Sequence, residues 1–329
     1  MSSKPSGAVL WGKLAWHPAV QAWSEIAPGA AHPETIQVLR RGRKKAGIYR
    51  LVNVAPNGGG GHLIAQHAPL PKALIERTVY RDILPQLPVP APHFYGFLAD
   101  GPEHAWLFLE DVGEERYEPA DPAHRVLGGQ WLAQMHTSAT GVAPARSLPV
   151  AGPARYLLHL RGGRCTIRMH LANPALAPEE GDTLRAIVAH LDRTQAAWAR
   201  IEAACAVCPN TLVHGDFRRK NVYLRRGPHR VELLPIDWET AGWGVPAIDL
   251  VRIDPAAYYA VARQTWSHLR LEDVHRLAVV GRILSQLAAI DWVSPQLGYE
   301  DPRYLIRPMS WLRDFRTQLG EALQELGVP

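Results

Sequence analysis

The spacing of the apolar residues changes once along this chain of 329 residues, and that change limits the folds it can adopt. Before residue 110 the chain is rich in expected strands, and residues 35–41 and 47–54 alternate apolar and polar residues, as half-buried β-strands do. After about residue 121, apolar residues recur at the spacing of amphipathic helices. The sequence therefore predicts an α+β fold with two lobes: a sheet-rich lobe at residues 1–110 and a larger, mainly helical lobe at residues 111–329. We expect a cleft between the lobes, where ligands commonly bind.

Individual segments of both lobes can be assigned from their patterns. Residues 35–41 and 47–54 flank a short basic loop and predict a β-hairpin. Residues 71–84 have helical spacing, and only two short strands, 221–224 and 231–237, are expected to interrupt the helical part. The remaining strands are expected at 62–68, 93–99 and 105–111, and the remaining helices at 122–139, 181–205, 273–292 and 310–326.

The composition is that of a globular chain, with 47% hydrophobic and 20% charged residues. The N-terminal segment has no apolar run of the length that a signal peptide needs. The most apolar later stretch, 277–292, is interrupted by Arg282, Ser285 and Gln286, so we interpret it as a buried helix and not as a membrane span. These features predict a cytoplasmic protein without a membrane segment, and they leave its oligomeric state open.

The cysteines and the charge bear on two further classes: proteins with a zinc or redox site formed by cysteines, and nucleic-acid-binding proteins. Cys205 and Cys208 form a C-x-x-C pair, but no second pair of ligands lies near it in sequence, so we interpret both as buried thiols. The formal net charge of +5 includes two local basic runs, 40–45 and 218–220. Neither run has interleaved aromatic residues, so we predict no nucleic-acid partner, although a basic nucleic-acid binder remains a minor alternative.

The densest chemical signal is the segment His214-Gly215-Asp216, which has Asn221 five residues after the aspartate. Asp237 ends the second of the two strands expected in this region. If these strands pair as an antiparallel hairpin, Asn221 and Asp237 lie side by side and Asp216 lies just before them. A carboxamide and a carboxylate oxygen are hard ligands of the kind that Mg²⁺ takes, together with phosphates and water. Asp216 is then left to orient a hydroxyl and to accept its proton.

The segments HGDFRRKN (214–221) and IDWETAGWGVPAIDL (236–250) resemble the phosphotransferase family that includes aminoglycoside phosphotransferases and choline kinases, a branch of the protein-kinase-like fold. The resemblance extends over roughly residues 36–291. It implies an enzyme, a small-molecule kinase that uses ATP or GTP and Mg²⁺ to phosphorylate a hydroxyl group. It also implies that Asp216 is the catalytic base and that the metal is held by Asn221 and Asp237.

The same resemblance implies several contacts to the nucleotide. The loop that begins at Gly42 would cover the phosphates with its backbone N–H groups and with the side chains of Lys44 and Lys45. At the end of the strand expected at 105–111, backbone groups of Glu110 and Val112 would meet the base.

One position departs from the family pattern. Where the resemblance implies a strand lysine that pairs with Glu76, this chain has Gln66, and the next lysine, Lys72, is expected to face the start of the following helix. Gln66 would still border the nucleotide and bond to Glu76, while Lys44 and Lys45 could supply the missing charge. The alternative is a pseudokinase-like module that binds a nucleotide or ligand with little or no turnover.

Several roles stay open at this stage. The resemblance implies that Asp249 braces the catalytic loop, and a residue placed like His214 is more often structural than an acid or base. Glu239 fits a position behind the metal and a contact to the acceptor equally well. The acceptor itself is not readable from the sequence, and antibiotics including aminoglycosides, sugars, amino alcohols and nucleosides all remain compatible. Three tryptophans fit an acceptor pocket, although core packing is the commoner explanation: Trp238, Trp243 and Trp292.

Overall fold

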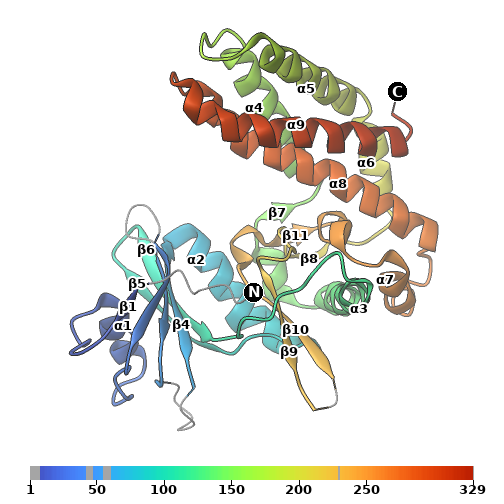
Figure 1. Ribbon diagram of the computed structural model, residues 1–329. Helices are drawn as coiled ribbons and strands as arrows, with labels where there is room; N and C mark the ends of the chain where they lie inside the picture. The colour runs from blue at the N-terminus through green and yellow to red at the C-terminus, as the bar shows by residue number, and fades with distance from the viewer. Residues whose placement is uncertain (1–7, 42–46, 55–60, 229, 329) are drawn as a thin grey trace. The chain divides into compact units, whose positions relative to one another are not determined.

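The structure, a computed structural model, describes residues 8–41, 47–54, 61–228 and 230–328. The chain forms two compact units. Figure 1 labels the helices and strands of both. The first unit comprises residues 1–118 and 216–241, and the second comprises residues 119–215 and 242–329. The segment with the predicted catalytic and metal-binding residues, 216–241, therefore belongs to the unit that carries the N-terminal sheet.

The first unit is built on a six-stranded antiparallel sheet with the order β1-β2-β3-β4-β6-β5. The five strands and the helix predicted before residue 111 are present, whereas strand β1 and helix α1 were not predicted. The elements are β1 (Val9–Leu10), α1 (Pro18–Ile26), β2 (Ile36–Arg41), β3 (Gly47–Leu51), β4 (Leu63–Pro69), α2 (Leu70–Arg77) with its π-helical continuation (Thr78–Ile83) and a 3-10 turn (Leu84–Gln86), β5 (Phe94–Asp100) and β6 (His104–Glu110).

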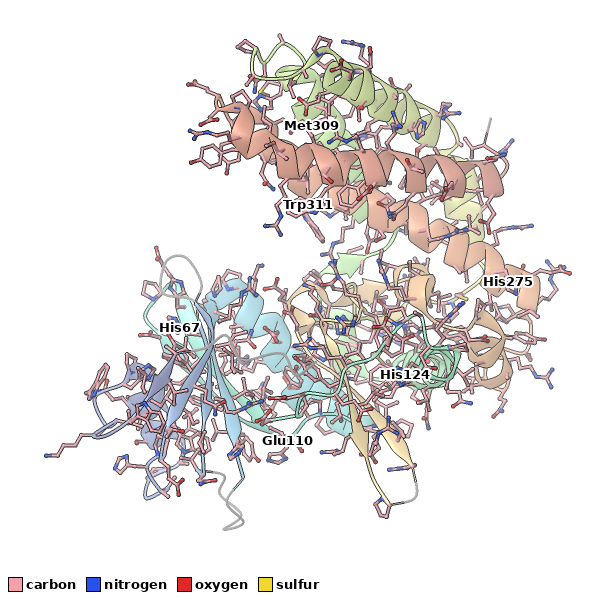
Figure 2. All side chains as sticks on the ribbon, in the orientation of Figure 1. His67, Glu110, His124, His275, Met309 and Trp311 are labelled. Carbon is pink, nitrogen blue, oxygen red and sulfur yellow. The ribbon has the colours of Figure 1, made fainter. Side chains whose placement is uncertain are left out.

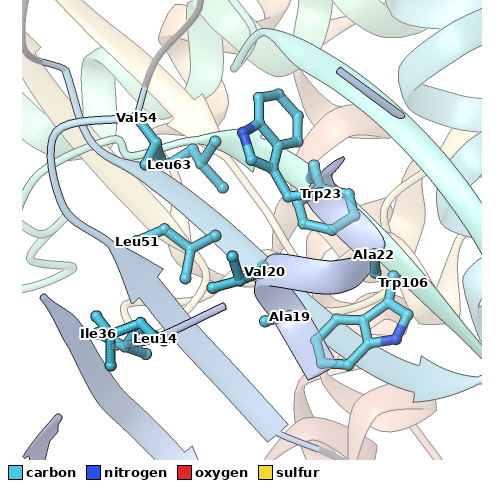
Figure 3. Close-up of a cluster of buried hydrophobic side chains, with 12 residues drawn as sticks. Leu14, Ala19, Val20, Ala22, Trp23, Ile36, Leu51, Val54, Leu63 and Trp106 are labelled. Carbon is cyan, nitrogen blue, oxygen red and sulfur yellow. The ribbon is translucent and has the colours of Figure 1, made fainter. Parts of the chain in front are cut away.

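The alternation of side chains along β6 explains how α1 and α2 cover the sheet. Trp106 and Phe108 pack with Trp23 of α1 in the hydrophobic cluster shown in Figure 3. Ala105 and Leu107 belong to a second cluster, formed with residues of β4 and α2. Because successive side chains of a strand point to opposite faces, β6 is buried on both faces, and Figure 1 shows α1 and α2 on the two sides of the sheet.

The hairpin predicted in the segment 216–241 is present. Strands β9 (Val222–Arg226) and β10 (Val231–Pro235) pair antiparallel. Just beyond the paired residues, the N–H of Ile236 donates to the carbonyl oxygen of Asn221 over 2.8 Å. This bond places Asn221 opposite Ile236 and beside the following residue, Asp237, as the pairing argument predicts.

The second unit is mainly helical, but its secondary structure differs from the prediction in three ways. The helix expected at 181–205 is interrupted at Ala197, two further helices (α4 and α7) are present, and three additional short strands form a small sheet. The helices are α3 (Pro122–Ala139), α4 (Pro153–His170), α5 (Pro178–Ala196), α6 (Trp198–Cys205), α7 (Pro255–Ala262), α8 (Leu271–Val293) and α9 (Pro302–Glu325), and 3-10 segments lie at Ala143–Ser147, Pro246–Arg252 and Ser294–Gly298.

The expectation of only two strands after residue 121 was wrong because the extra strands are too short to show a periodicity. They are β7 (Val150–Ala151), β8 (Thr211–Val213) and β11 (Gly242–Gly244), with β11 in the centre. A Cβ on Gly244 would lie 2.2 Å from the carbonyl carbon of Ala151, so this pairing needs glycine at that position. Strand β8 leads directly into His214 and Gly215.

Helix α8 runs through the core of the second unit, beside α4 and α9 (Figure 1). The segment Leu271–Gly298 is long and apolar enough to cross a membrane by length and composition, but 67% of its most apolar window is buried inside the protein, as in a core helix. Its Gly281 lets the segment Pro246–Arg252 approach closely, because a Cβ there would lie 1.9 Å from the carbonyl oxygen of Ala247. This close approach positions Asp249, which the site requires.

Candidate active site

Asp249 anchors the two residues that precede the predicted base. Its Oδ2 accepts the N–H of His214 over 2.7 Å, and its Oδ1 accepts the N–H of Gly215 over 2.9 Å. The Nε2 of His136 lies 3.3 Å from the same Oδ2, and Asp249 is only 1% exposed. Asp249 therefore braces the catalytic loop, as the resemblance implies. His214 is fully buried, which agrees with a structural role.

Asp216 follows Gly215 and is surrounded by donors from its own loop. Arg218 donates from Nε to its Oδ1, and the ammonium of Lys220 lies 3.0 Å from its Oδ2. Asn221 donates from Nδ2 to the same Oδ2 over 2.8 Å and to the Asp216 carbonyl over 3.1 Å. The Asp216 side chain is 12% exposed. It is thus held in one orientation while keeping access to solvent.

Asn221 and Asp237 offer the oxygen ligands predicted for a metal. Because Asn221 is 2% exposed and turns its Nδ2 toward Asp216, its carboxamide oxygen is the atom left to meet a cation. Asp237 has a left-handed backbone, with φ 67°, which turns the chain sharply after β10. The Lys220 ammonium lies 3.9 Å from Asp237 Oδ2. A positive charge therefore already stands beside both Asp216 and Asp237.

The donor set fits Mg²⁺. Among the residues that the structure describes, no three His, Cys, Asp or Glu side chains are grouped so that they could hold a metal ion. Mg²⁺ does not need such a cage, since it usually keeps water and takes one or two carboxylates together with phosphate oxygens. One carboxylate from Asp237 and one carboxamide oxygen from Asn221 match that preference.

Gln66 and Glu76 meet at the position where the resemblance implies an ion pair. Gln66 donates from Nε2 to Glu76 Oε1 over 2.8 Å, and Glu76 is fully buried. Burial raises the pKa of Glu76 to about 8, and the nearby carboxylates of Asp237 and Glu239 add to the rise. Hydrogen bonds from Gln66 and the Trp238 backbone oppose it less strongly. An amide and a carboxyl of raised pKa thus meet where the resemblance implies a lysine–glutamate ion pair.

Lys72 lies in the first turn of α2 and pairs with a residue of another segment. Its Nζ lies 2.9 Å from Glu239 Oε1, in the 3-10 turn Trp238–Thr240 that follows Asp237. The reason is the packing of this turn against α2, which carries Lys72. Lys72 therefore neutralises one of the carboxylates near the proposed metal ligands.

Of the two residues predicted to contact the nucleotide base, Glu110 is the last residue of strand β6 and Val112 lies two residues beyond it. Glu110 lies at the end of the sheet opposite His67, as Figure 2 shows. Its N–H donates to the His93 carbonyl over 2.9 Å, and its side chain accepts from the Arg225 guanidinium. A contact of Glu110 to a base would therefore use its carbonyl oxygen, followed by Val112 two residues on. The phosphate-loop residues Gly42, Lys44 and Lys45 lie outside the described residues.

The three tryptophans and the cysteine pair have different surroundings. Trp238 is fully buried and donates from Nε1 to the Pro235 carbonyl, which agrees with core packing. Trp292 is 50% exposed, so core packing does not explain it. Its ring lies edge-on to His159, which pairs with Asp291 at 2.8 Å. Trp243 lies beneath the Arg146 guanidinium.

The cysteine pair is buried. Burial raises the pKa of both Cys205 and Cys208 to about 12, so these thiols are unreactive near neutral pH.

Lys220 was not singled out by the sequence reasoning, which treated it only as part of the basic run 218–220. A signal was available, because it lies four residues after Asp216 and directly before Asn221. Spacing alone did not show which member of the run turns inward.

Comparison with solved structures shows the fold to which this chain belongs. The chain resembles the GDP and kanamycin complex of APH(2")-IIIa at 14% identity with a TM-score of 0.62, covering 93% of this chain and 99% of that one. It resembles choline kinase from Cryptosporidium parvum at 12% identity with a TM-score of 0.58, covering 89% and 91% of the two chains. It also resembles spectinomycin phosphotransferase APH(9)-Ia bound to ADP and spectinomycin, at 10% identity with a TM-score of 0.55, covering 88% and 93%. These likenesses confirm the predicted bilobal, kinase-like α+β fold.

The sequence itself gives the family. Residues 53–269 match the model of the phosphotransferase enzyme family, and this segment includes the catalytic loop, the hairpin and Asp249. The chain belongs to that family and is a phosphotransferase, as the resemblance implied. A search of curated protein sequences finds no match.

Proposed function

We propose that this phosphotransferase moves the γ-phosphoryl group of ATP or GTP to a hydroxyl group of a small molecule. The observation that carries the proposal is the arrangement at the end of the β9–β10 hairpin. There, Asn221 bonds to Asp216 and lies beside Asp237, so a proton acceptor and two oxygen ligands belong to one short segment. Membership of the phosphotransferase enzyme family and the kinase-like fold support the same reaction.

In the proposed reaction, Asp216 accepts the hydrogen bond of the acceptor hydroxyl and orients its oxygen toward the γ-phosphorus. The bond from this oxygen to phosphorus forms as the bond from phosphorus to the β–γ bridging oxygen breaks, and the nucleoside diphosphate leaves with that electron pair. The hydroxyl proton passes to Asp216. Bound Mg²⁺, held by Asp237 and Asn221, would neutralise charge on the phosphate oxygens. Catalysis rests mostly on positioning and charge neutralisation.

The identity of the nucleotide follows less directly. Among the similar structures one holds GDP and another ADP, so both purine nucleotides are candidate donors. We propose that the base meets backbone groups of Glu110 and Val112 at the end of β6. Use of a nucleoside triphosphate fits a cytoplasmic location.

The acceptor is proposed only as a class. One similar structure is a complex with kanamycin, another contains spectinomycin and a third is a choline kinase, and all three compounds are hydroxyl-bearing amines. We propose a small hydroxylated acceptor for this chain, with amino alcohols, sugars and antibiotics as the first candidates. No nucleic-acid or membrane partner enters the proposal.

A ligand screen followed by product detection tests the proposed function. Candidate acceptors are first ranked by thermal shift in the presence of Mg²⁺ and a non-hydrolysable ATP or GTP analogue. Those that raise the melting temperature are then incubated with ATP or GTP, and the products are analysed by mass spectrometry. A phosphorylated acceptor supports the proposal. Nucleotide binding without transfer to any stabilising acceptor would overturn it in favour of a nucleotide-binding module without turnover.

A further inference from the structure

The side chain of Lys220 bridges the two carboxylates to which the proposed reaction assigns different tasks. Its ammonium lies 3.0 Å from Asp216 Oδ2 and 3.9 Å from Asp237 Oδ2. One of these carboxylates would hold the acceptor hydroxyl, and the other would face the phosphates through the metal. In the proposed reaction the phosphoryl group is transferred beside these two carboxylates, so its negative charge would lie near Lys220.

The three cations of this basic loop have different partners: Arg218 donates to Asp216, whereas Lys220 lies within reach of both Asp216 and Asp237. Its neighbour Arg219 turns away, and its Nε pairs with Glu118 Oε2 at 2.9 Å. The Lys220 side chain is 56% exposed, so it can reach a ligand without leaving a buried position. Two adjacent cations with similar exposure therefore have different partners, and only Lys220 of the two contacts the carboxylates of the proposed site.

Two other side chains near the proposed site provide no unpaired positive charge for a phosphate group. Gln66 brings an uncharged amide to Glu76, and the ammonium of Lys72 is paired with Glu239. A nucleoside triphosphate would add several negative charges beside Asp216 and Asp237. An ammonium within reach of both carboxylates would offset part of that charge, since preorganised cations stabilise phosphoryl groups during transfer.

We propose that Lys220 is a catalytic residue whose ammonium contacts the transferring phosphoryl group between Asp216 and Asp237. This inference rests on the proposed phosphoryl transfer. On nucleotide binding the ammonium exchanges part of its contact with the two carboxylates for phosphate oxygens. It thereby supplies in the catalytic loop the positive charge that Gln66 does not supply on the strand.

The first test compares turnover among variants of the loop. Lys220→Ala should lower kcat by roughly 10²–10³-fold, the loss typical for removal of one group that stabilises charge in the transition state. Lys220→Arg keeps the charge and should restore a large part of the activity. Arg219→Ala removes a neighbouring cation that points elsewhere and should behave like wild type. Wild-type turnover by Lys220→Ala, or an equal loss in Arg219→Ala, would overturn the proposal.

The second test does not depend on turnover. Affinity for ATP is measured by calorimetry in the presence of EDTA, so that no metal contributes. Lys220→Ala should bind metal-free ATP about tenfold more weakly than wild type or worse, whereas Arg219→Ala should be unchanged. If Lys220 only occupies the place of the metal ion, Lys220→Ala will instead bind Mg²⁺ with ATP more tightly and keep its turnover, and that result would contradict the proposal.

The two levels of inference fail in different ways. If wild-type protein binds nucleotide but transfers phosphate to no acceptor, the proposed function fails, and the metal-free affinity alone decides whether Lys220 contacts the phosphates. If wild-type protein transfers phosphate and Lys220→Ala does so equally well, only the role of Lys220 fails.

Discussion

Gln66 donates to Glu76 over 2.8 Å inside the first unit, so a pair that contains a neutral amide stands where the resemblance implies an ion pair. Burial raises the pKa of Glu76 to about 8. Because Gln66 brings no positive charge, its hydrogen bond opposes this rise only weakly. Near neutral pH this carboxyl therefore mostly carries its proton. A lysine at position 66 would reverse that balance, so the pair offers two separate tests.

Gln66→Lys tests whether the site lacks a phosphate-binding cation. We expect little change in ATP affinity or turnover, because the account assigns the phosphate-binding charge to Lys220 and to the predicted phosphate-loop residues Lys44 and Lys45. Nucleotide affinity and kcat measured with Mg²⁺ check this expectation. A gain of about tenfold or more, equivalent to about 1.4 kcal/mol, would show that the missing strand lysine limits the enzyme.

Glu76 should make the metal-free protein less stable as the pH rises. Its pKa in the folded state, about 8, lies above the ordinary value of 4.5 for a glutamate, so the folded state holds this proton more tightly than the unfolded state. The stabilisation is complete below about pH 4.5 and is lost as the pH passes through 8, with a slope of at most about 1.4 kcal/mol per pH unit. Urea unfolding in EDTA at several pH values measures the slope, and Glu76→Gln should flatten it. An unchanged slope in that variant would remove Glu76 as the cause.

Asp249→Ala should destabilise the second unit strongly. The substitution leaves the N–H groups of His214 and Gly215 and the imidazole of His136 without their buried acceptor, and breaking such a buried pair costs roughly 3–5 kcal/mol. Asp254→Ala is a matched control, because Asp254 accepts one N–H, that of Ala257, at the start of α7, and loss of such a cap costs about 1 kcal/mol. Chemical denaturation compares the two. Equal losses would mean that the anchoring by Asp249 is worth no more than a helix cap.

Two substitutions test the assignment of the metal ligands, and we expect the first to have the larger effect. Asp237→Asn keeps a residue type that tolerates the left-handed backbone, but it removes the negative charge, so Mg²⁺-dependent stabilisation by nucleotide should be abolished. Asn221→Ala removes a neutral oxygen and should weaken that stabilisation less. Thermal shift with nucleotide, with and without Mg²⁺, gives the measurement. Intact Mg²⁺ dependence in both variants would rule out this pair as the metal ligands.

The sequence allowed the sheet, the hairpin and the catalytic loop to be predicted because each depends on local signals. The alternation along β2 and β3 and the short turn after β9 were visible without tertiary information. Strand β11 was not, since two of its three residues are glycines that serve a close backbone approach to Ala151. Such an approach is a property of packing and leaves no periodicity to detect.

The site was predictable to the level of its residue types but not of its pairings. The proximity of Asp216, Asn221 and Asp237 followed from their spacing, and the bond of Gln66 to Glu76 followed from their chemistry. The contacts of Lys72 with Glu239 and of Lys220 with two carboxylates did not, because a long flexible side chain can reach several partners. Only the placement of the neighbouring elements selects among them.

Asp216→Asn tests the central claim, that this loop carries out phosphoryl transfer with Asp216 as the base. The substitution keeps the size of the side chain but removes the proton acceptor and the charge that orients the hydroxyl. The measurement is kcat for the best acceptor found in the screen, together with nucleotide affinity in the same variant. The account predicts a fall in kcat of about 10²–10⁴-fold with nucleotide affinity largely kept. Phosphorylation of the acceptor at the wild-type rate by Asp216→Asn would contradict it.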